Sequence, residues 1–421
     1  MKENTFERVD EKLYSEVLDN GIRVFLYPTK KTKNFYISIS VKYGAKVTKY
    51  KLNDKVYDII PGSAHFLEHK VMALSENKEI SKRINELGSL ANAWTSYEGT
   101  NYNIFGSINI IENLKILLDL FYNTDINEKN VEEEKGIIGE EIDMYKDEIN
   151  SYIYSELYKN LFNKSYVRNT VVGERSDIEK ITSESLNRVY SHFYTSNNTF
   201  IIVTGDFDKD EIMNVIKDYI GKLNLKPKKL PKVIKEKEPD KVSVAFEEIS
   251  KNMNDIRVRY ALKMKKNIFG IKDDEILRYY MSIILSNNFS ATSPLFEKYK
   301  NENITSRLSY SFNIVDDHVV IIISSVCSDA NIFIDNISKD IKKMTLNESE
   351  FERKKKMALK IYVTSFDNIE DIEYDLCSSI LYEDKINYHE YSDLMSTTYK
   401  EAKRILETID YSNISIIRTS K

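Results

Sequence analysis

Two kinds of hydrophobic pattern follow each other along the chain, and this succession occurs twice. Residues 21–45 hold two runs rich in β-branched and aromatic residues around a lysine-rich turn, which predicts a pair of strands. Residues 131–162 then place apolar side chains every three or four positions without a proline, which predicts one or two long helices. The first half of the chain is therefore expected to begin with strands and to continue into helices.

The second half repeats this order. Residues 241–266 again offer two β-rich runs, here separated by a polar loop, and helical periodicity follows at residues 273–285 and 348–366. Each half also closes with a helix-like segment before an apolar strand, which is Thr199–Gly205 in the first half and ISIIRT near the C-terminus in the second. The pattern predicts an α+β fold used twice.

A change in composition separates the two repeats. Residues 226–240 hold three of the six prolines among many like charges and have little apolar surface to bury. We predict a linker here, between a first domain at residues 1–225 and a second at residues 241–421. A chain of 421 residues is long enough for two cores of this size.

Composition and charge narrow the function classes. The net charge is -5 and the lysines are interspersed with glutamates, so no basic surface is expected and nucleic acid is not a predicted partner. The start of the chain lacks the pattern of a signal peptide, and the most apolar run, Val319–Cys327, is too short for a membrane helix. The two cysteines, Cys327 and Cys377, are too few for a disulfide framework. We therefore expect a cytoplasmic protein without a membrane partner.

Two of the five histidines stand four residues apart in the stretch GSAHFLEHKV. The segment at residues 64–74 has good helix formers, so His65 and His69 should project from one helical face and converge on one cation such as Zn²⁺. Glu68 lies beside the same face and is the candidate general base for a water at that cation. The alternative is that these side chains merely decorate an amphipathic helix, but their order as H-x-x-E-H, which marks the inverzincins, argues against it.

The wider motif PGSAHFLEHKVM resembles the active-site helix of the pitrilysin, insulysin and mitochondrial processing peptidase superfamily. Within that superfamily the chain is most similar to the bacterial YmfH-type processing peptidases. The resemblance implies a fold of two homologous α/β-roll halves, each a mostly antiparallel sheet packed with helices. It also implies a zinc-binding first half and a metal-free second half.

Further site residues follow from the same resemblance. The stretch EEKGIIGEEIDMY, residues 133–145, is similar to the family helix that carries the third zinc ligand, which implies that Glu141 completes the metal site and that Glu134 supports it. By themselves these glutamates would be assigned to a solvated acidic face. Asn92, Ala93 and Trp94 match the family's edge strand, whose backbone binds an extended peptide substrate, although Trp94 could equally be a core residue.

The second half resembles the family more loosely. Tyr310 aligns with a family tyrosine that stabilises the oxyanion, but Lys300 or a neighbour stands where the family has an arginine, and Arg307 is too close to Tyr310 to replace it. Related bacterial pairs divide these roles between two subunits. The resemblance therefore implies a heterodimer with a metal-free paralogue, with a homodimer as the alternative.

Together these features predict a zinc metalloendopeptidase. It would cleave peptides or unfolded segments inside a closed chamber, and we hypothesise that it processes ribosomal peptides or leader sequences. The alternative function is a non-catalytic structural or peptide-binding subunit of a processing complex, which would bind through the edge strand alone.

Overall fold

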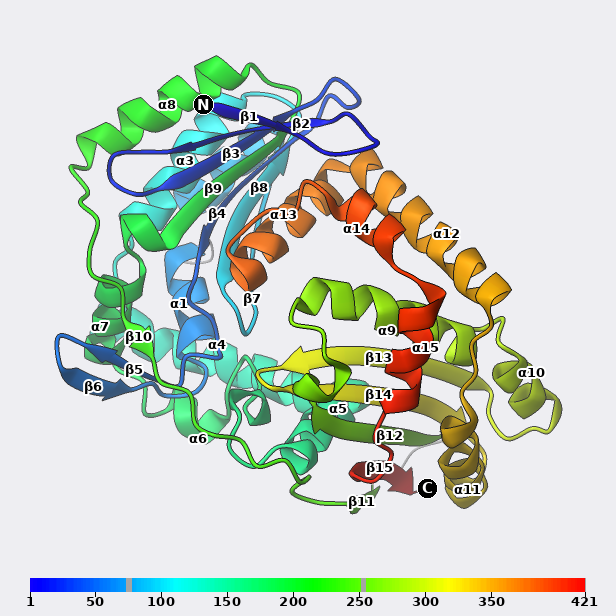
Figure 1. The fold of residues 1–421 in the computed structure, drawn as a ribbon. Helices are drawn as coiled ribbons and strands as arrows, with labels where there is room; N and C mark the ends of the chain where they lie inside the picture. The colour runs from blue at the N-terminus through cyan, green and yellow to red at the C-terminus, as the bar shows by residue number, and fades with distance from the viewer. Residues whose placement is uncertain (73–77, 251–254, 421) are drawn as a thin grey trace. The chain divides into compact units, whose positions relative to one another are not determined.

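The computed structural model describes residues 1–72, 78–250 and 255–420 (Figure 1). The chain forms two compact units, and each unit collects segments that are distant in the sequence. Unit 1 comprises Met1–Glu148, Asn169–Lys235 and Val363–His389. Unit 2 comprises Ile149–Arg168, Glu236–Tyr362 and Glu390–Lys421.

Unit 1 is built on a seven-stranded sheet in which all neighbouring strands are antiparallel except β3 and β9. In spatial order the strands are β1 (Lys2–Thr5), β2 (Lys12–Val17), β3 (Arg23–Pro28), β9 (Thr199–Gly205), β4 (Phe35–Val41), β8 (Thr100–Gly106) and β7 (Leu90–Thr95). A small second sheet has the order β10 (Lys232–Val233), β5 (Lys49–Leu52) and β6 (Lys55–Asp58). Strand β7 is the last strand at one edge of the larger sheet.

Helices cover both faces of this sheet (Figure 1). The α-helices of unit 1 are α1 (Ser63–Met72), α2 (Lys78–Glu86), α3 (Ile110–Tyr122), α4 (Glu128–Asp147), α6 (Arg175–Ile178), α7 (Ser183–Phe193), α8 (Lys209–Lys222) and α13 (Ile369–Glu383). Helices α1, α3 and α8 contact strands of the sheet, and α13 packs against β9 and β4. The sheet is therefore buried between two helical layers.

The two faces differ in chemistry. On β4, the side chains of Ile37 and Ile39 lie in the apolar core, whereas Ser38 lies on the opposite face and is also fully buried. There α13 places Glu373 against the sheet, and its carboxylate accepts hydrogen bonds from Ser38 Oγ and from Asn101 Nδ2, the latter at 3.1 Å. Burial disfavours the charged carboxylate more than these hydrogen bonds favour it, so the pKa of Glu373 is raised to about 7.

Unit 2 repeats the plan with a five-stranded sheet, in which only β11 and β15 are parallel neighbours. Its strands in order are β11 (Phe246–Ser250), β15 (Ile414–Ser420), β12 (Ile256–Lys265), β14 (His318–Cys327) and β13 (Arg307–Val315). Its helices are α5 (Ile149–Leu161), α9 (Asp274–Phe289), α10 (Pro294–Asn301), α11 (Ala330–Asp340), α14 (Glu390–Ser396) and α15 (Tyr399–Thr408), and α12 (Glu348–Thr364) begins here and ends just past the boundary. Short 3₁₀ helices occur at Tyr166–Arg168, Ser196–Asn198, Lys266–Phe269, Ile341–Lys343 and Ser365–Asp367.

The predicted fold class is confirmed, because the chain has two halves of mixed sheet and helix and each sheet is mostly antiparallel. The compact units nevertheless differ from the predicted domains, 1–225 and 241–421. Residues 149–168 join unit 2, because α5 packs on β15 and β12, and residues 363–389 join unit 1, because α13 packs on β9 and β4. Hydrophobic periodicity identifies such helices but not the sheet on which they pack.

The predicted linker, residues 226–240, is also held more firmly than its composition suggested. In unit 1, β10 pairs with β5. In unit 2, the buried carboxylate of Glu238 accepts hydrogen bonds from three consecutive backbone N–H groups, those of Asn163, Lys164 and Ser165. The same carboxylate binds the buried Lys263 ammonium at 2.7 Å. These partners offset the cost of burying the charge.

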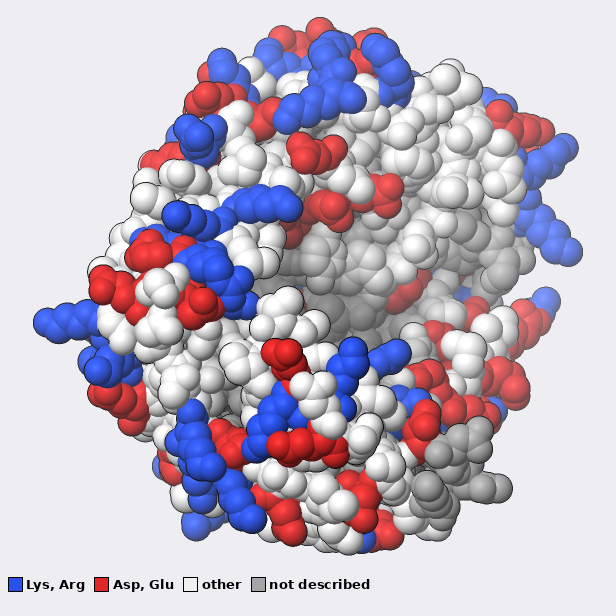
Figure 2. Space-filling model, turned by 90° about the vertical axis from the view of Figure 1, so that its right-hand side faces the viewer, with Lys and Arg blue, Asp and Glu red and all other residues white. Residues whose placement is uncertain are grey.

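Figure 2 shows Lys and Arg side chains interspersed with Asp and Glu on the face in view. Among the described residues, no helix has both the length and the apolar character needed to cross a membrane.

Candidate metal centre

Helix α1 places two imidazoles beside each other. It begins at Ser63, directly after Gly62, whose φ of 86° and close approach to the Val172 carbonyl favour glycine. His65 and His69 follow one turn apart, with ring centroids separated by 4.6 Å. The predicted helix is therefore present as far as Met72, and residues 73–74 of that prediction lie outside the described residues.

Helix α4 brings a carboxylate to the same point. Its N-terminus is capped by Asn127, whose side chain accepts a hydrogen bond from the Asn130 backbone N–H. Glu141 Oε2 lies 3.5 Å from His65 Nε2 and 3.4 Å from His69 Nε2. Among the described residues, these three side chains form the group able to hold a metal, and their donor atoms all lie within 4.8 Å of one another.

This donor set fits zinc. Two imidazole nitrogens and one carboxylate oxygen are typical of catalytic zinc sites that keep a fourth position open. In a tetrahedral site with zinc–ligand bonds of about 2.0–2.2 Å, two ligand atoms are about 3.3–3.6 Å apart. The two separations of Glu141 Oε2 from the imidazole nitrogens, 3.5 and 3.4 Å, fall within that range.

A second carboxylate of α4 orients His69. Glu134 Oε1 lies 2.8 Å from His69 Nδ1, the ring nitrogen that faces away from Glu141. Glu134 Oε2 accepts a hydrogen bond from the fully buried ammonium of Lys70 at 3.2 Å, and this ammonium also donates to the Asn130 carbonyl at 3.1 Å. A carboxylate in this position fixes the orientation of an imidazole ligand and increases its basicity.

The electrostatics of the cluster favour a protonated His69 and ionised carboxylates on Glu141 and Glu134. Burial lowers the pKa of His69, but hydrogen bonds to Glu134 and Glu141 outweigh it and raise that pKa to about 9. Hydrogen bonds from His65 and His69 lower the pKa of Glu141 to about 2. Burial would raise the pKa of Glu134, yet the His69 hydrogen bond and the Lys70 charge together lower it. In the protein without metal, this site therefore holds a proton that a cation must displace.

Glu68 lies beside the cluster without joining it. Its Oε2 accepts a hydrogen bond of 2.5 Å from Thr95 Oγ1, at the end of β7. Glu68 is partly exposed, so its carboxylate can contact a water or a substrate. This is the arrangement expected of a proton acceptor next to a metal, with its side chain restrained by a neighbouring hydroxyl.

The three predicted substrate-binding residues lie on β7. The Ala93 backbone N–H donates to the Asn92 side chain, Ala93 N to Asn92 Oδ1, at 2.9 Å. Trp94 is half-buried, and its ring centroid lies 6.2 Å from that of Tyr374 on α13. The structure thus places Asn92, Ala93 and Trp94 on an edge strand that ends at Thr95, the residue that contacts Glu68 of α1. Their role in binding substrate stays a prediction.

Tyr310 belongs to the other compact unit. It lies on the edge strand β13, half-buried, 6.4 Å from Phe289 between ring centroids, and burial raises its pKa. The metal cluster, by contrast, lies in unit 1. Its catalytic role stays a prediction.

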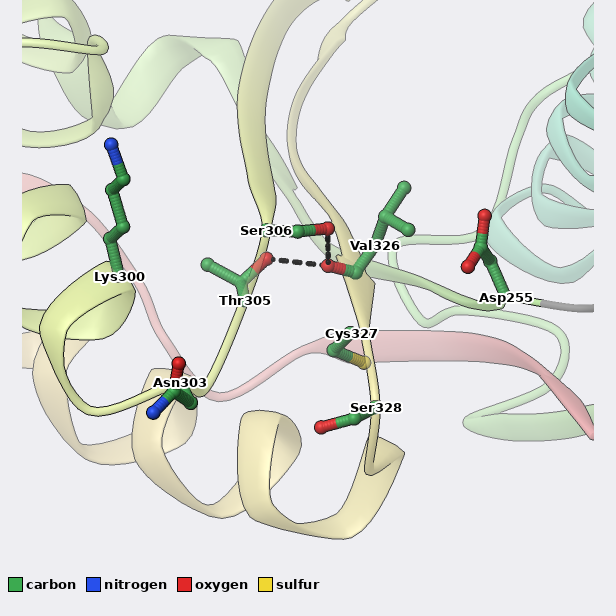
Figure 3. A pocket seen from close by; sticks show the side chains of 8 residues that line it. All are labelled: Asp255, Lys300, Asn303, Thr305, Ser306, Val326, Cys327 and Ser328. Carbon is green, nitrogen blue, oxygen red and sulfur yellow. Dashed lines mark hydrogen bonds between the residues drawn. The ribbon is translucent and has the colours of Figure 1, made fainter.

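Lys300 lines a polar pocket of about 640 Å³ in unit 2 (Figure 3). The Thr305 and Ser306 hydroxyls in this pocket both donate to the Val326 carbonyl. None of the proposed zinc ligands lines the pocket.

The three remaining histidines do not join the metal cluster. His192 Nδ1 contacts the Tyr50 hydroxyl at 2.6 Å, and His389 pairs with Glu7 at 2.6 Å. His318 is buried at the start of β14. Both cysteines are buried free thiols.

Three further residues around the site were not predicted from the sequence. Lys70 lies on the buried face of α1. It follows Phe66 by four positions, so the helical period places both on the same face, and this was the available signal for a buried lysine. Tyr145 lies one turn after Glu141, and burial together with the charges of Glu141 and Glu68 raises its pKa. Thr95 carried no comparable signal, because its contact with Glu68 arises from tertiary structure.

Comparison with known proteins agrees with this fold. Residues 31–175 match the family model Insulinase (Peptidase family M16), and residues 180–358 match the model described as Peptidase M16 inactive domain. The zinc protease YmfH of Bacillus subtilis, whose function is uncharacterised, is 30% identical over 316 residues, which cover 73% of this chain and 72% of the relative. The chain therefore belongs to peptidase family M16.

More distant relatives share parts of the chain or its fold. The mitochondrial-processing peptidase subunit beta of Neurospora crassa is 22% identical over 254 residues, which cover 59% of this chain and 49% of that subunit. The crystal structure of a protease from Helicobacter pylori superposes with a TM-score of 0.81 at 18% identity and covers 98% of this chain and 100% of that one. The superposition supports the two-half fold, and the named relatives place the chain in a family of zinc proteases.

Proposed function

We propose that this chain is a zinc-dependent endopeptidase in which His65, His69 and Glu141 hold Zn²⁺. The observation that carries the proposal is the convergence of their donor atoms within 4.8 Å, with Glu68 between the two histidines on α1. When bound, zinc polarises a peptide carbonyl and lowers the pKa of a water ligand toward about 7.

The protein's own residues supply the remaining steps. The exposed edge of β7 binds an extended peptide backbone, which positions the scissile bond near Thr95 and Glu68. Glu68 accepts a proton from the attacking water and passes it to the leaving amine. Glu134 holds His69 in the tautomer that leaves Nε2 free to bind the metal.

Substrate and partner are part of the proposal. An edge strand selects extended backbones, so we propose that peptides or unfolded segments, including ribosomal peptides or leader sequences, are cleaved within a closed chamber. Tyr310, or an arginine from a metal-free paralogous partner, would stabilise the developing oxyanion. A heterodimer is favoured because Lys300 or a neighbour replaces the family arginine, and a relative is named as a subunit of a processing peptidase. A homodimer is the alternative, and a cytoplasmic location stays a prediction from the sequence.

A second candidate is a non-catalytic structural or peptide-binding subunit. Its support is the match of residues 180–358 to a domain described as inactive. This alternative requires the edge strand but not the proton acceptor Glu68.

A direct experiment measures zinc content and cleavage of unfolded peptides by the purified chain, alone and with a chain of similar length from the same genome that lacks HxxEH. We expect chelation to abolish cleavage. We expect Glu68→Gln to retain zinc and to lower kcat about 10²–10⁴-fold. The matched control is Glu140→Gln, whose side chain is 84% exposed on α4 beside Glu141. Zinc binding without cleavage in either mixture would favour the non-catalytic alternative.

A further inference from the structure

An apolar surface lies beside the proposed substrate-binding edge. Alternating side chains of β7 point to opposite faces of the sheet, and Ala91 and Ala93 pack on the core. Leu90, Asn92 and Trp94 therefore share the other face. Leu90 is 69% exposed, so this face carries an apolar side chain in contact with solvent.

Helix α13 contributes an aromatic ring to the same surface. Tyr374 is 58% exposed and its ring lies 6.2 Å from that of Trp94. The adjacent Glu373 binds Asn101 at 3.1 Å, and Asn101 is the cross-strand partner of Trp94. The buried hydrogen bond between Glu373 and Asn101 holds α13 against β8, and this placement of the helix brings Tyr374 beside Trp94.

The neighbouring backbone lies at the edge of the sheet, where a strand could be added. Strand β7 ends the sheet, and its Ala93 N–H donates to the neighbouring side chain, at Asn92 Oδ1. That amide oxygen occupies the place where the carbonyl of an added strand would accept a hydrogen bond. Strand β7 ends at Thr95, whose hydroxyl donates to Glu68 on α1, so a strand added along β7 would reach the proposed catalytic group.

We propose that Leu90, Trp94 and Tyr374, termed here the apolar face, select apolar side chains at two positions of an extended peptide bound along β7. This inference rests on the proposed function and names the chemical class of its substrate. The peptide pairs with β7, so every second peptide side chain lies on the apolar face.

The spacing of the two positions follows from strand geometry. Leu90 and Trp94 are four residues apart, which is about 13 Å at roughly 3.3 Å per residue. The peptide side chains opposite them are likewise four residues apart. Asn92 lies between, so the intervening side chain on this face meets a polar group. The selected pattern is apolar, any residue, polar, any residue, apolar.

The test uses Trp94, the single tryptophan of the chain, as its probe. The full chain carrying Glu68→Gln is loaded with zinc and titrated with short peptides that have Phe or Ser at the two selected positions and are otherwise identical. We expect the Phe peptides to change Trp94 emission and to bind at least about tenfold more tightly than the Ser peptides. Peptides with the two Phe residues three apart instead of four serve as a register control and should lose most of this gain.

Variants identify the residues responsible. We expect Tyr374→Ala to lower the preference for Phe over Ser about tenfold at the peptide position opposite Trp94. Leu90→Ser should lower the same preference at the position opposite residue 90. The matched control is Tyr382→Ala, on the same helix and also 58% exposed. Equal binding of Phe and Ser peptides, or equal loss in Tyr374→Ala and Tyr382→Ala, would overturn the inference.

Binding and cleavage separate this inference from the proposed function. The active chain is assayed against the same peptides. Selective binding without cleavage, both by the chain alone and by its mixture with the chain of similar length that lacks HxxEH, would support the apolar face and contradict the proposed peptidase. Cleavage at equal rates whatever residues occupy the two positions would support the peptidase and contradict the selection by the apolar face.

Discussion

The buried pair formed by Lys70 and Glu134 offers a quantitative test of how the site is supported. The side chains of both residues are almost fully buried and lie 3.2 Å apart. The perturbation is a double-mutant cycle of Glu134→Gln and Lys70→Met, in which both replacements approximate the size of the original side chain. Each single variant leaves one buried charge without its partner, whereas the double variant removes both charges.

The magnitudes follow from the partners that remain. Glu134→Gln leaves the Lys70 ammonium with the Asn130 carbonyl and an amide oxygen, which places the cost near the lower end of a broken buried pair, about 3 kcal/mol. Lys70→Met leaves Glu134 bonded to His69, so about 2 kcal/mol is expected. The double variant should cost only about 2 kcal/mol, which corresponds to a coupling of about 3 kcal/mol.

The assay combines unfolding and metal affinity. Urea unfolding of the metal-free chains is followed by the emission of Trp94, which lies in unit 1 with the pair. Zinc affinity is measured by competition with a chromogenic chelator. We expect Glu134→Gln to weaken zinc binding about 10–100-fold, because His69 loses the carboxylate that orients it. Lys70→Met should change zinc affinity far less, because Glu134 still contacts His69.

Two results would refute this reasoning. If the single effects on the free energy of unfolding added within about 0.5 kcal/mol, the two charges would not be coupled. If Lys70→Met and Glu134→Gln weakened zinc binding equally, Glu134 would have no specific role toward His69. Glu140→Gln, exposed on the same helix, should alter neither quantity.

Further predictions concern protons and a hydroxyl. Zinc binding at about pH 7 should release a proton from His69, whose pKa without metal is about 9, and the release is measured by calorimetric titration in buffers of different ionisation enthalpy; zinc uptake without proton release would contradict it. The pKa of Glu373 is raised from 4.5 to about 7, so the native state retains a proton that the unfolded chain loses, and stability should fall by about 3 kcal/mol as pH rises from about 4.5 to 7. Glu373→Gln should reduce this pH dependence of the free energy of unfolding, measured by urea unfolding at a series of pH values. An unchanged pH dependence in the variant would show that other groups cause the fall. Thr95→Val should lower kcat about tenfold with KM nearly unchanged, because Glu68 loses the donor that orients it; an equal change in both parameters would indicate a binding role.

Much of the fold was accessible from hydrophobic periodicity. The segment predicted as one or two helices at residues 131–162 forms α4 and α5, which meet at Glu148, where the backbone is extended. The helix predicted at residues 348–366 corresponds to α12, Glu348–Thr364. The polar loop predicted within residues 241–266 lies partly outside the described residues. Periodicity reports which face of an element is buried, so it locates such elements well.

The assignment of helices to units was not accessible in this way. Helix α13 has an apolar stripe like that of any amphipathic helix, yet it covers a polar sheet face through Glu373. A buried glutamate on that stripe is recognised only when its partners, Ser38 and Asn101, are known to lie opposite. These partners are more than 270 residues away along the chain, as the separations of 335 and 272 residues show.

In the candidate site, too, some residues could be predicted from local sequence and others depend on tertiary structure. His65, Glu68 and His69 could be proposed from helical spacing, because they lie within one turn. Glu141 required the family resemblance, since an acidic helix face is usually solvated. The contacts of Thr95 with Glu68 and of Tyr374 with Trp94 depend on the sheet and α13, and local sequence carries no trace of them.

The central claim is that three side chains from α1 and α4 bind one zinc ion and leave a coordination position open. A crystal structure of the zinc-loaded chain, with anomalous diffraction recorded on both sides of the zinc absorption edge, tests it most directly. We predict one strong anomalous peak about 2.0–2.2 Å from His65 Nε2, His69 Nε2 and a Glu141 carboxylate oxygen, with the fourth coordination position facing Glu68. A peak elsewhere, or a zinc ion bound by the two imidazoles while Glu141 stays out of reach, would contradict it.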